Sequence, residues 1–389
     1  MLPEPMGGEF RCINIARRLM RSAGWGSCEP PGPADEGKGV KHPLTPEAPG
    51  LSPGAAHISG HSPSVDVLRR LPTVLTAEEL LDKIFRKSSR ISGSNERERI
   101  INKLSTISNT SKDYFNRIIS SHPDYDSLPS FYREMVDLLV GVEKIKKSLA
   151  SLSWANSMIQ KIVTKSIGRI KKGQNPVEVY RGACGRIASL IEDIDEDLKF
   201  LNEAKNRLKE IPTLRDMPTV VVAGYPNVGK SSFVSLVSTA KPEIAEYPFT
   251  TKKIFIGYTK DLQIIDTPGL LDRPLAKRNA VERKAILCLK HAADAILYII
   301  DPTETCGYPL KSQLSLLEEI KRTFGKPMLE VYSKADLHEF RDRPAFSTRS
   351  GEGIREIMEE ITKIALKNYS QTSTFIADSG QTSTQEQHS

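Results

Sequence analysis

The sequence predicts two kinds of fold in one chain: an α/β domain on a mostly parallel sheet, preceded by an all-α antiparallel helical bundle. From about Leu71 to Ile211, apolar residues recur at steps of three and four, which is the spacing of amphipathic helices. From Met217 onward, short β-rich runs alternate with helical segments. Such alternation predicts parallel strands with helices covering both faces of the sheet.

The first predicted helix begins in "TAEELLDKIFRK", where Thr76 suits the N-cap and Glu79 the partner position of a capping box. A long apolar stripe then predicts one long helix, through Phe131, Met135, Leu138, Val142, Ile145, Leu149, Leu152, Ala155, Ile159 and Ile162. A partner stripe runs through Tyr180, Ile187, Leu190, Ile194, Leu198, Leu201 and Leu208. Long amphipathic helices with short links imply an antiparallel bundle.

In the second half, strands are expected at residues 219–224, 253–258, 262–266, 294–301, 327–333 and 345–349. Helices are expected at residues 229–239, 275–291, 309–323 and 351–367. We therefore divide the chain into a disordered extension (1–66), a helical bundle that is a candidate for RNA binding (67–215), the α/β domain (216–369) and a disordered polar tail (370–389). The extension holds ten prolines and ten glycines, a composition typical of disorder.

Composition narrows the class of protein. The longest apolar runs are strand-sized, far short of the roughly 18–20 residues needed to cross a bilayer, so no membrane partner is expected. Five cysteines without a CxxC pair favour a reducing compartment, with neither a disulfide frame nor a zinc site. A net charge of +7 is compatible with nucleic acid but is also common among soluble proteins. We expect a monomer located in the cytoplasm.

The first strand of the α/β domain runs into "GYPNVGKSS", which matches G-x-x-x-x-G-K-[ST] between a strand and a helix. The backbone N–H groups of such a loop cradle phosphates at the positive end of the helix. Lys230 neutralises the phosphate charge, and the Ser231 hydroxyl ligates magnesium. The predicted loop contacts are Gly224, Tyr225, Pro226, Asn227, Val228, Gly229, Lys230, Ser231 and Ser232.

Two later segments supply switch residues for the terminal phosphate. "YPFTTKK" (247–253) offers a threonine to magnesium and the γ-phosphate. In "DTPG", Asp266 ends a strand and suits contact with magnesium through water, while the Gly269 N–H can bond to the γ-phosphate. Many such proteins follow this glycine with a polar residue that positions the attacking water, but here Leu270 and Leu271 follow. We therefore expect slow intrinsic hydrolysis.

Two more segments select the base. In "SKAD" (333–336), Asp336 can accept from guanine N1 and N2, and the Lys334 stem can cover the ring. In "STRSGEG", the Thr348 N–H faces the base oxygen, flanked by the further contacts Ser347 and Arg349. Ser333 stands where Asn or Thr is usual, so guanine affinity is expected to fall. Together these motifs predict a P-loop GTPase domain that takes GTP or GDP with Mg²⁺.

With these motifs in view, "GYPNVGKSSF", "YPFTTK" and the hydrophobic residue after "DTPG" resemble the Obg-related GTPases. "DTPGLLDRPLAKRNAVERKAI", "LYIIDPTETCGYPLKSQ" and "HPDYDSLPSFYREMVDLL" resemble the nucleolar GTP-binding protein 1 family in its short archaeal form, over residues 71–368. The resemblance implies a role in large ribosomal subunit assembly, with Thr251 rather than Thr250 as the magnesium ligand and Lys230, Thr251 and Gly269 as the catalytic set. It leaves two roles open for Asn227: binding K⁺ beside the phosphates, or bracing the loop.

Between Lys144 and Val177 the chain carries eight basic residues and no acidic one. The basic stripe of Lys161, Lys165, Arg169 and Lys172 falls on one helical face, where it could follow an RNA backbone or be merely solvated. The family resemblance favours rRNA of the pre-ribosomal large subunit as partner, and an activating protein factor is a further candidate. The leading hypothesis is a GTP-hydrolysing assembly switch. The alternatives are an Obg-type regulator of translation or stress, and a GTP-gated RNA-binding scaffold with negligible turnover.

Overall fold

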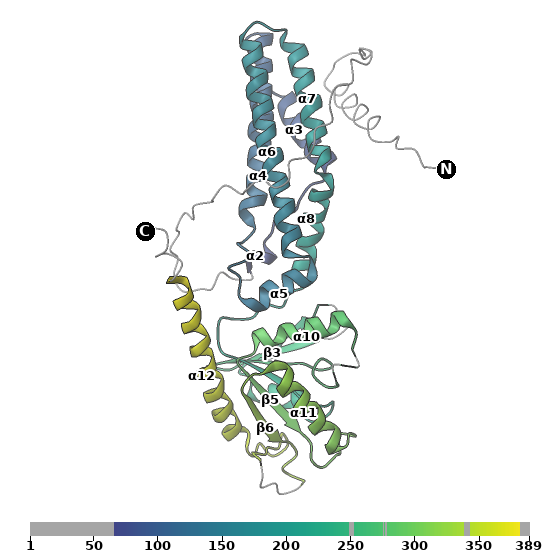
Figure 1. Ribbon diagram of the computed structural model, residues 1–389, viewed down its shortest axis with the longest axis vertical. Helices are drawn as coiled ribbons and strands as arrows, with labels where there is room; N and C mark the ends of the chain where they lie inside the picture. The colour runs from purple at the N-terminus through teal and green to yellow at the C-terminus, as the bar shows by residue number, and fades with distance from the viewer. Residues whose placement is uncertain (1–65, 249–252, 275, 277, 338–342, 382–389) are drawn as a thin grey trace, which may run out of the picture. The chain divides into compact units, whose positions relative to one another are not determined.

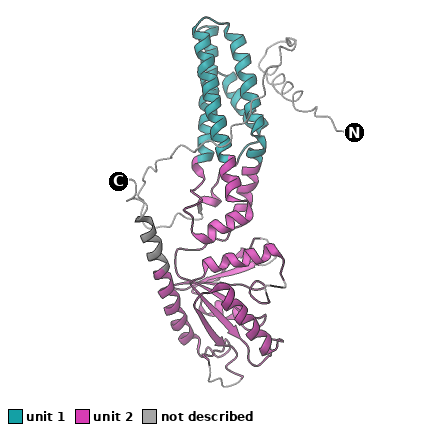
Figure 2. Ribbon diagram, in the orientation of Figure 1, with its two compact units in different colours: residues 1–62, 74–119, 149–199 teal, residues 63–73, 120–148, 200–389 magenta. Residues whose placement is uncertain are grey.

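The computed structural model describes residues 66–248, 253–274, 276, 278–337 and 343–381. Within these ranges the chain forms two compact units, coloured separately in Figure 2. Unit 1 comprises residues 74–119 and 149–199, and unit 2 comprises residues 66–73, 120–148 and 200–381. The extension predicted at 1–66 lies outside the described residues apart from Asp66, where the short helix α2 (Asp66–Arg69) begins.

Unit 1 is an antiparallel helical bundle, as the apolar periodicity predicts (Figure 1). It contains all of α3 (Ala77–Ser89) and α7 (Pro176–Asp193), most of α4 (Glu96–Ser121) and α6 (Val142–Lys171), and the start of α8 (Asp195–Leu208). Hydrogen bonds fix the directions. Arg97 on α4 donates to the Lys171 carbonyl of α6, and Ser108, further along α4, donates to Gln160 on α6. Residue numbers therefore rise along α4 where they fall along α6, so the two helices are antiparallel.

Local sequence signals explain where these helices begin. Thr76 and Glu79 form the predicted capping box of α3, because each side chain accepts from the other residue's backbone N–H. Asn175 caps α7, whose first residue is Pro176, a position where the missing N–H costs nothing. The stripe between residues 131 and 162 is not one helix, so that prediction is wrong. It divides into α5 (Ser130–Leu139) and α6 because Gly141 adopts a left-handed φ of 82°.

Unit 2 holds a six-stranded sheet in the order β2-β3-β4-β1-β5-β6. Its strands are β1 (Thr219–Ala223), β2 (Glu243–Glu246), β3 (Lys253–Tyr258), β4 (Gln263–Asp266), β5 (Ala295–Ile300) and β6 (Met328–Tyr332). β4, β1, β5 and β6 run parallel, and β2 and β3 form an antiparallel edge. The predicted mostly parallel sheet is therefore confirmed, and the carboxyl ends of β1, β5 and β6 lie next to one another.

Helices cover both faces of this sheet (Figure 1). α9 (Lys230–Val237) and α12 (Ile354–Gln381) contact each other and the strands, and α10 (Ala280–Ala292) and α11 (Leu310–Phe324) form a second pair. Within the same unit, α5 packs against α10. One bond across that contact joins His291 Nε2 and Glu134 Oε1 at 2.9 Å.

Four details of the α/β half differ from the sequence prediction. β2 was not predicted, because its residues are mostly exposed on the sheet edge and lack a buried apolar pattern. Residues 345–349 form no strand; only Ala345 bridges to Tyr332. α10 starts at Ala280 rather than 275, at the capping residue Asn279. The tail predicted to be disordered from Ser370 continues α12 to Gln381, since a helix already formed extends readily through residues that lack proline.

Candidate GTP-binding site

The phosphate loop joins β1 to α9, and its glycines are demanded by geometry. Gly224 has a φ of 138°, and a Cβ there would lie 2.4 Å from the Ile299 carbonyl oxygen. Gly229 has a φ of 101° and precedes Lys230, the first residue of α9. Only glycine takes these conformations without strain. The loop therefore turns sharply and directs free backbone N–H groups of the α9 N-terminus toward one place.

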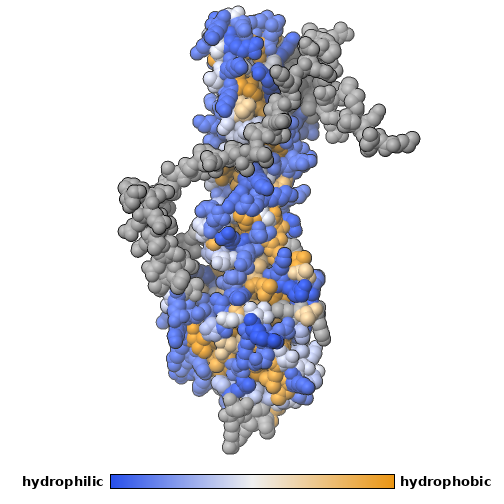
Figure 3. All heavy atoms as spheres, in the orientation of Figure 1, coloured by the Kyte–Doolittle hydropathy of each residue, from blue (hydrophilic) through white to orange (hydrophobic). Residues whose placement is uncertain are grey.

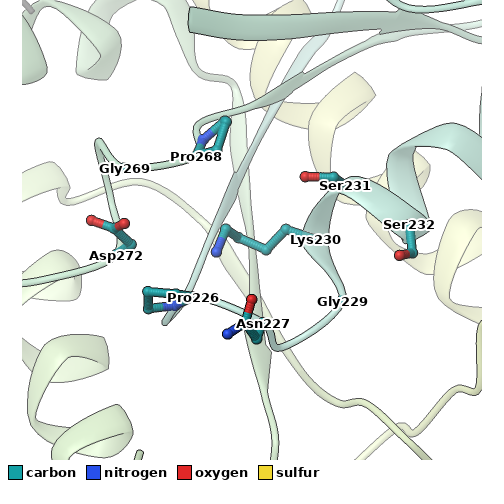
Figure 4. Close-up of a pocket in the computed structure, with 9 residues that line it drawn as sticks. All are labelled: Pro226, Asn227, Gly229, Lys230, Ser231, Ser232, Pro268, Gly269 and Asp272. Carbon is teal, nitrogen blue, oxygen red and sulfur yellow. The ribbon is translucent and has the colours of Figure 1, made fainter. Parts of the chain in front are cut away.

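That place is a pocket of about 430 Å³ (Figure 4). The pocket is lined by Pro226, Asn227, Gly229, Lys230, Ser231, Ser232, Pro268, Gly269 and Asp272. Thus "GYPNVGKSS" and "DTPG", which are far apart in the sequence, face the same space. Val228 is buried and does not line the pocket, so only its backbone can contribute.

Lys230 is the buried cation of the pocket. Its Nζ donates to the backbone carbonyls of Gly224 (2.9 Å) and Tyr225 (2.7 Å). Burial lowers the pKa of Lys230, while the carboxylates of Asp266 and Asp272 act in the opposite direction. A phosphate placed here would restore favourable charge around the ammonium group.

Ser231 and Asp266 are the two predicted magnesium-site residues that lie within the described part of the chain. Asp266 Oδ2 accepts a hydrogen bond from the Ser231 hydroxyl, but its buried Oδ1 has no hydrogen-bond partner among the described residues. Burial raises the pKa of Asp266 against the effects of Ser231 and Lys230. A buried carboxylate oxygen without a partner is costly, and a hydrated divalent cation beside it would remove that cost. The residues therefore fit Mg²⁺. The third predicted ligand, Thr251, lies outside the described residues, as does Thr250.

The "DTPGLLDRP" loop is fastened at several points. The Gly224 N–H donates to the Leu271 carbonyl at 3.1 Å, and the Leu270 N–H donates to the Thr267 carbonyl at 3.0 Å. Both leucine side chains are buried, at 0% and 1% exposure. They pack into the core and leave the pocket to other groups.

The predicted base-binding residues follow β6. The Ser347 hydroxyl donates to Asp336 Oδ1 at 2.6 Å, and this bond, ahead of the burial that opposes it, lowers the pKa of Asp336. Arg349 Nη1 lies 3.9 Å from Asp336 Oδ2 but is largely exposed. Thr348 is half-buried between them. Ser333 is buried, and its hydroxyl donates to the Ile300 carbonyl of β5 at 3.2 Å.

The sequence reasoning missed Asp301, a fully buried carboxylate at the end of β5. It accepts from Lys334 Nζ (2.5 Å), Thr303 Oγ1 (2.5 Å), Thr305 Oγ1 (3.2 Å) and the Cys306 N–H (2.7 Å). The sequence did contain a signal for this residue, an acidic side chain directly after an apolar strand. In the sheet that strand, β5, lies next to β1, which leads into the phosphate loop. Arg278 and Asp272, which pair beside the pocket, were also missed.

The basic stripe lies partly on α6 in unit 1. Lys161, Lys165 and Arg169 are exposed on that helix, whereas Lys172 follows its last residue in the connecting turn. Arg169 Nε donates to Gln174 Oε1 at 2.5 Å. The stripe predicted from the sequence is thus exposed, with its last member outside the helix.

Two family models match the chain: the NOG1 N-terminal helical domain over residues 68–215, and nucleolar GTP-binding protein 1 (NOG1) over residues 280–336. The uncharacterized protein MJ1408 of Methanocaldococcus jannaschii is 38% identical over 282 residues, covering 69% of this chain and 81% of the relative. Nucleolar GTP-binding protein 1 of Drosophila melanogaster is 33% identical over 241 residues, covering 60% of this chain and 37% of the relative. A crystal structure assigned to nucleolar GTP-binding protein 1 of Plasmodium falciparum is 32% identical, with a TM-score of 0.35, and covers 44% of this chain and 97% of that chain.

The phosphate loop, the sheet and the base motifs define a GTP-binding protein of the P-loop GTPase class. The family matches are more specific, and the chain belongs to the nucleolar GTP-binding protein 1 family. The chain spans less than half of the fruit-fly relative's length. The predicted cytoplasmic location is wrong, because the eukaryotic relatives, including the yeast protein, are named nucleolar. None of the described helices is long and apolar enough to span a membrane.

Proposed function

We propose that this chain binds GTP with Mg²⁺, hydrolyses it slowly, and acts as a switch in assembly of the large ribosomal subunit. The single observation that carries the nucleotide part is the convergence of Lys230, Ser231 and Gly269 in one pocket, together with Asp266 Oδ1, a buried oxygen that accepts no hydrogen bond from any described residue. Magnesium would be held by Ser231 and Thr251, with Asp266 contacting it through water, and would neutralise phosphate charge.

This chain's own residues account for the remaining interactions with the nucleotide. Lys230 and the N–H groups of the loop and α9 bind the phosphates, and the Gly269 N–H donates to the γ-phosphate. Asp336, held by Ser347, accepts from guanine. Adenine presents no matching donors, so the site selects GTP over ATP.

The nucleotide proposal is tested by titrating fluorescent GTP and ATP analogues and then measuring phosphate release. Lys230→Ala should abolish detectable binding, because Lys230 is the buried cation of the pocket in which we propose that the phosphates bind. Lys260→Ala is the matched control, since Lys260 is an exposed lysine of the same unit outside the pocket. Equal affinity of Lys230→Ala and the control for GTP would refute the assignment.

We keep both roles of Asn227 in the proposal. Asn227 lines the pocket in a left-handed conformation, with a φ of 62°, so glycine can replace it without backbone strain. If Asn227 helps to bind K⁺, wild-type turnover should be faster in KCl than in NaCl, and Asn227→Gly should remove the difference. If turnover is equal in the two salts, Asn227 only braces the loop.

The assembly part of the proposal rests on family membership and on the exposed basic stripe. Trp154, also on α6, is 48% exposed. It lies seven residues before Lys161 and eleven before Lys165, which places all three on one helical face. Lysines can follow an RNA backbone while an exposed indole stacks on an unpaired base. Pre-large-subunit rRNA is the partner we propose, and in a cell with a nucleolus we expect the chain to act there.

Sedimentation with large-subunit precursors tests this partner. The wild-type chain should co-sediment at low salt, and a Lys161→Ala/Lys165→Ala variant should do so less. Lys112→Ala is the control, because Lys112 is exposed on α4. If the chain stays free in every salt and nucleotide condition, the assembly role fails and an Obg-type regulatory role becomes the better reading. Turnover near zero with and without rRNA, despite RNA binding, would favour the scaffold.

A further inference from the structure

The side chains that directly follow "DTPG" cannot position water. Leu270 and Leu271 are apolar and buried, and the carbonyl of Leu271 is occupied by the Gly224 N–H. Yet hydrolysis of a phosphoanhydride needs a group that orients the attacking water in line with the leaving oxygen. The next residue along the loop is Asp272.

Asp272 is the only carboxylate among the described residues that line the pocket. Its side chain is 14% exposed. Figure 4 shows its carboxylate beyond the end of the Lys230 side chain, on the side of the pocket away from Ser231. Because Ser231 and Asp266 mark the magnesium side, Asp272 lies toward the opposite side, next to Gly269.

Arg278 holds Asp272 in that position. Its side chain is only 1% exposed, its Nη2 donates to Asp272 Oδ1 at 3.1 Å, and its Nη1 donates to the Gly269 carbonyl at 3.0 Å. One buried guanidinium thus fixes both the Asp272 carboxylate and Gly269, the glycine whose N–H we propose as a donor to the γ-phosphate. The planar fork of arginine suits this double contact, and a lysine ammonium would not reproduce it.

We propose that Asp272, oriented by Arg278, accepts a hydrogen bond from the attacking water and so replaces the polar residue absent at positions 270 and 271. This inference rests on the proposed GTP hydrolysis. In the step, a lone pair of the water oxygen forms the bond to the γ-phosphorus. The bond from phosphorus to the bridging oxygen breaks, and its electron pair stays on GDP. Both protons of the water end on the released phosphate, one on the new hydroxyl oxygen and the other on a former γ-phosphate oxygen.

Charge balance allows a carboxylate beside the γ-phosphate. Arg278 forms an ion pair with Asp272, and Lys230 is close enough to Asp272 to attract its carboxylate. These two cations offset the repulsion between Asp272 and the phosphate oxygens. Arg278 is therefore a positioning residue, acting through Asp272 and the Gly269 carbonyl rather than on the nucleotide.

The test compares Asp272→Asn, Asp272→Glu and wild type in single-turnover GTP hydrolysis. The wild-type rate is measured first, so that a failure of the proposed hydrolysis is seen separately. Asp272→Asn should lower the rate constant about 100-fold, the size of effect expected when one positioned group is lost. Its affinity for fluorescent GTP should stay within about threefold, since ground-state binding does not depend on the water. Asp272→Glu should recover part of the rate.

Two controls exclude a merely structural effect. Asp261→Asn removes an exposed carboxylate of a turn in the same unit and should leave the rate unchanged. Affinity for GDP with aluminium fluoride, which mimics the transferring phosphoryl group, should fall in Asp272→Asn while GDP affinity does not. Arg278→Lys should lower the rate and leave GTP affinity in place. The inference is overturned if wild type hydrolyses GTP and Asp272→Asn keeps its rate and its aluminium fluoride affinity, or if wild type does not turn over at all.

Discussion

Replacement of Asp301 by Asn should weaken both the fold of unit 2 and its hold on guanine. The Asp301 carboxylate is fully buried and accepts from Lys334 Nζ at 2.5 Å, from two threonine hydroxyls and from backbone N–H groups. Asn keeps the shape but removes the charge and presents an N–H₂ group to donors. Lys334 keeps a partner in the Thr305 hydroxyl at 2.6 Å, and its side chain is 26% exposed, so it can turn toward water.

The magnitude follows from these contacts. Breaking a buried ion pair costs about 3–5 kcal/mol when the remaining charge stays buried. Because Lys334 is partly exposed, we expect the lower end, about 3 kcal/mol. For a unit of this size, each kcal/mol lowers Tm by roughly 2–4 °C, so the melting point should fall by roughly 6–12 °C. GTP and GDP should both bind about fivefold more weakly, since Lys334 loses the anchor that would hold its stem over the base in the proposed complex.

Thermal unfolding followed by circular dichroism measures the first effect, and fluorescent-nucleotide titration measures the second. The pH dependence adds a check. Burial alone would raise the pKa of Asp301, but the bonds from Lys334, Thr303 and Cys306 hold it below the ordinary carboxyl value. A lowered carboxyl pKa contributes stability above the unfolded pKa of roughly 3.9, and this is lost as pH falls through the folded value. The gap in stability between wild type and Asp301→Asn should therefore narrow below about pH 4. A melting point within about 1 °C of wild type at neutral pH would refute this reasoning.

Three further outcomes follow from the same structure. Leu270→Gln should not speed hydrolysis. It should destabilise the fold by about 1–3 kcal/mol, because it buries an amide where the leucine is 0% exposed. A gain in turnover would show that a side chain at position 270 can reach the pocket. Gly353→Ala should weaken nucleotide binding. Gly353 has a φ of 70°, and an added Cβ would lie 1.9 Å from the Ala345 carbonyl oxygen, beside the turn predicted to bind the base. An unchanged affinity in fluorescent-nucleotide titration would contradict this. Lys161→Ala/Lys165→Ala should reduce the slope of log affinity for rRNA against log salt concentration by roughly 1.5–2, because two phosphate contacts are lost. Filter binding measures this slope. An unchanged slope would show that these lysines do not contact the RNA.

The fold class and the nucleotide motifs could be predicted because their signals are local. A strand, a glycine loop and Lys230 occur within about a dozen residues, and the helical stripes repeat within each turn. β2 carried no such signal, since an exposed edge strand does not need buried apolar residues. The break at Gly141 was missed because the apolar spacing continues across it and only the backbone conformation reveals it.

The missed site residues share a different cause. Asp301 and Lys334 are 33 residues apart and meet only because β5 and β6 are neighbours in the sheet. Arg278 meets Gly269 only because the chain folds back before α10. Neither Asp301 nor Arg278 belongs to a motif with fixed spacing, so the partners of these two side chains became visible only in the packed structure. The motif residues predict a nucleotide site, while Asp301 and Arg278 hold motif residues in place through their hydrogen bonds.

The two leucines after "DTPG" fix the position of their own loop against the phosphate loop. Buried side chains and the bond from the Gly224 N–H to the Leu271 carbonyl tie this loop to the phosphate loop. A glutamine at position 270 could not make that apolar contact and also face the pocket. With the leucines packed inward, the chain emerges at Asp272, where Arg278 meets the carboxylate. The loop is thus fixed by the two buried leucines. The polar group that we propose to orient the attacking water is Asp272, two residues after the position where such a residue usually stands.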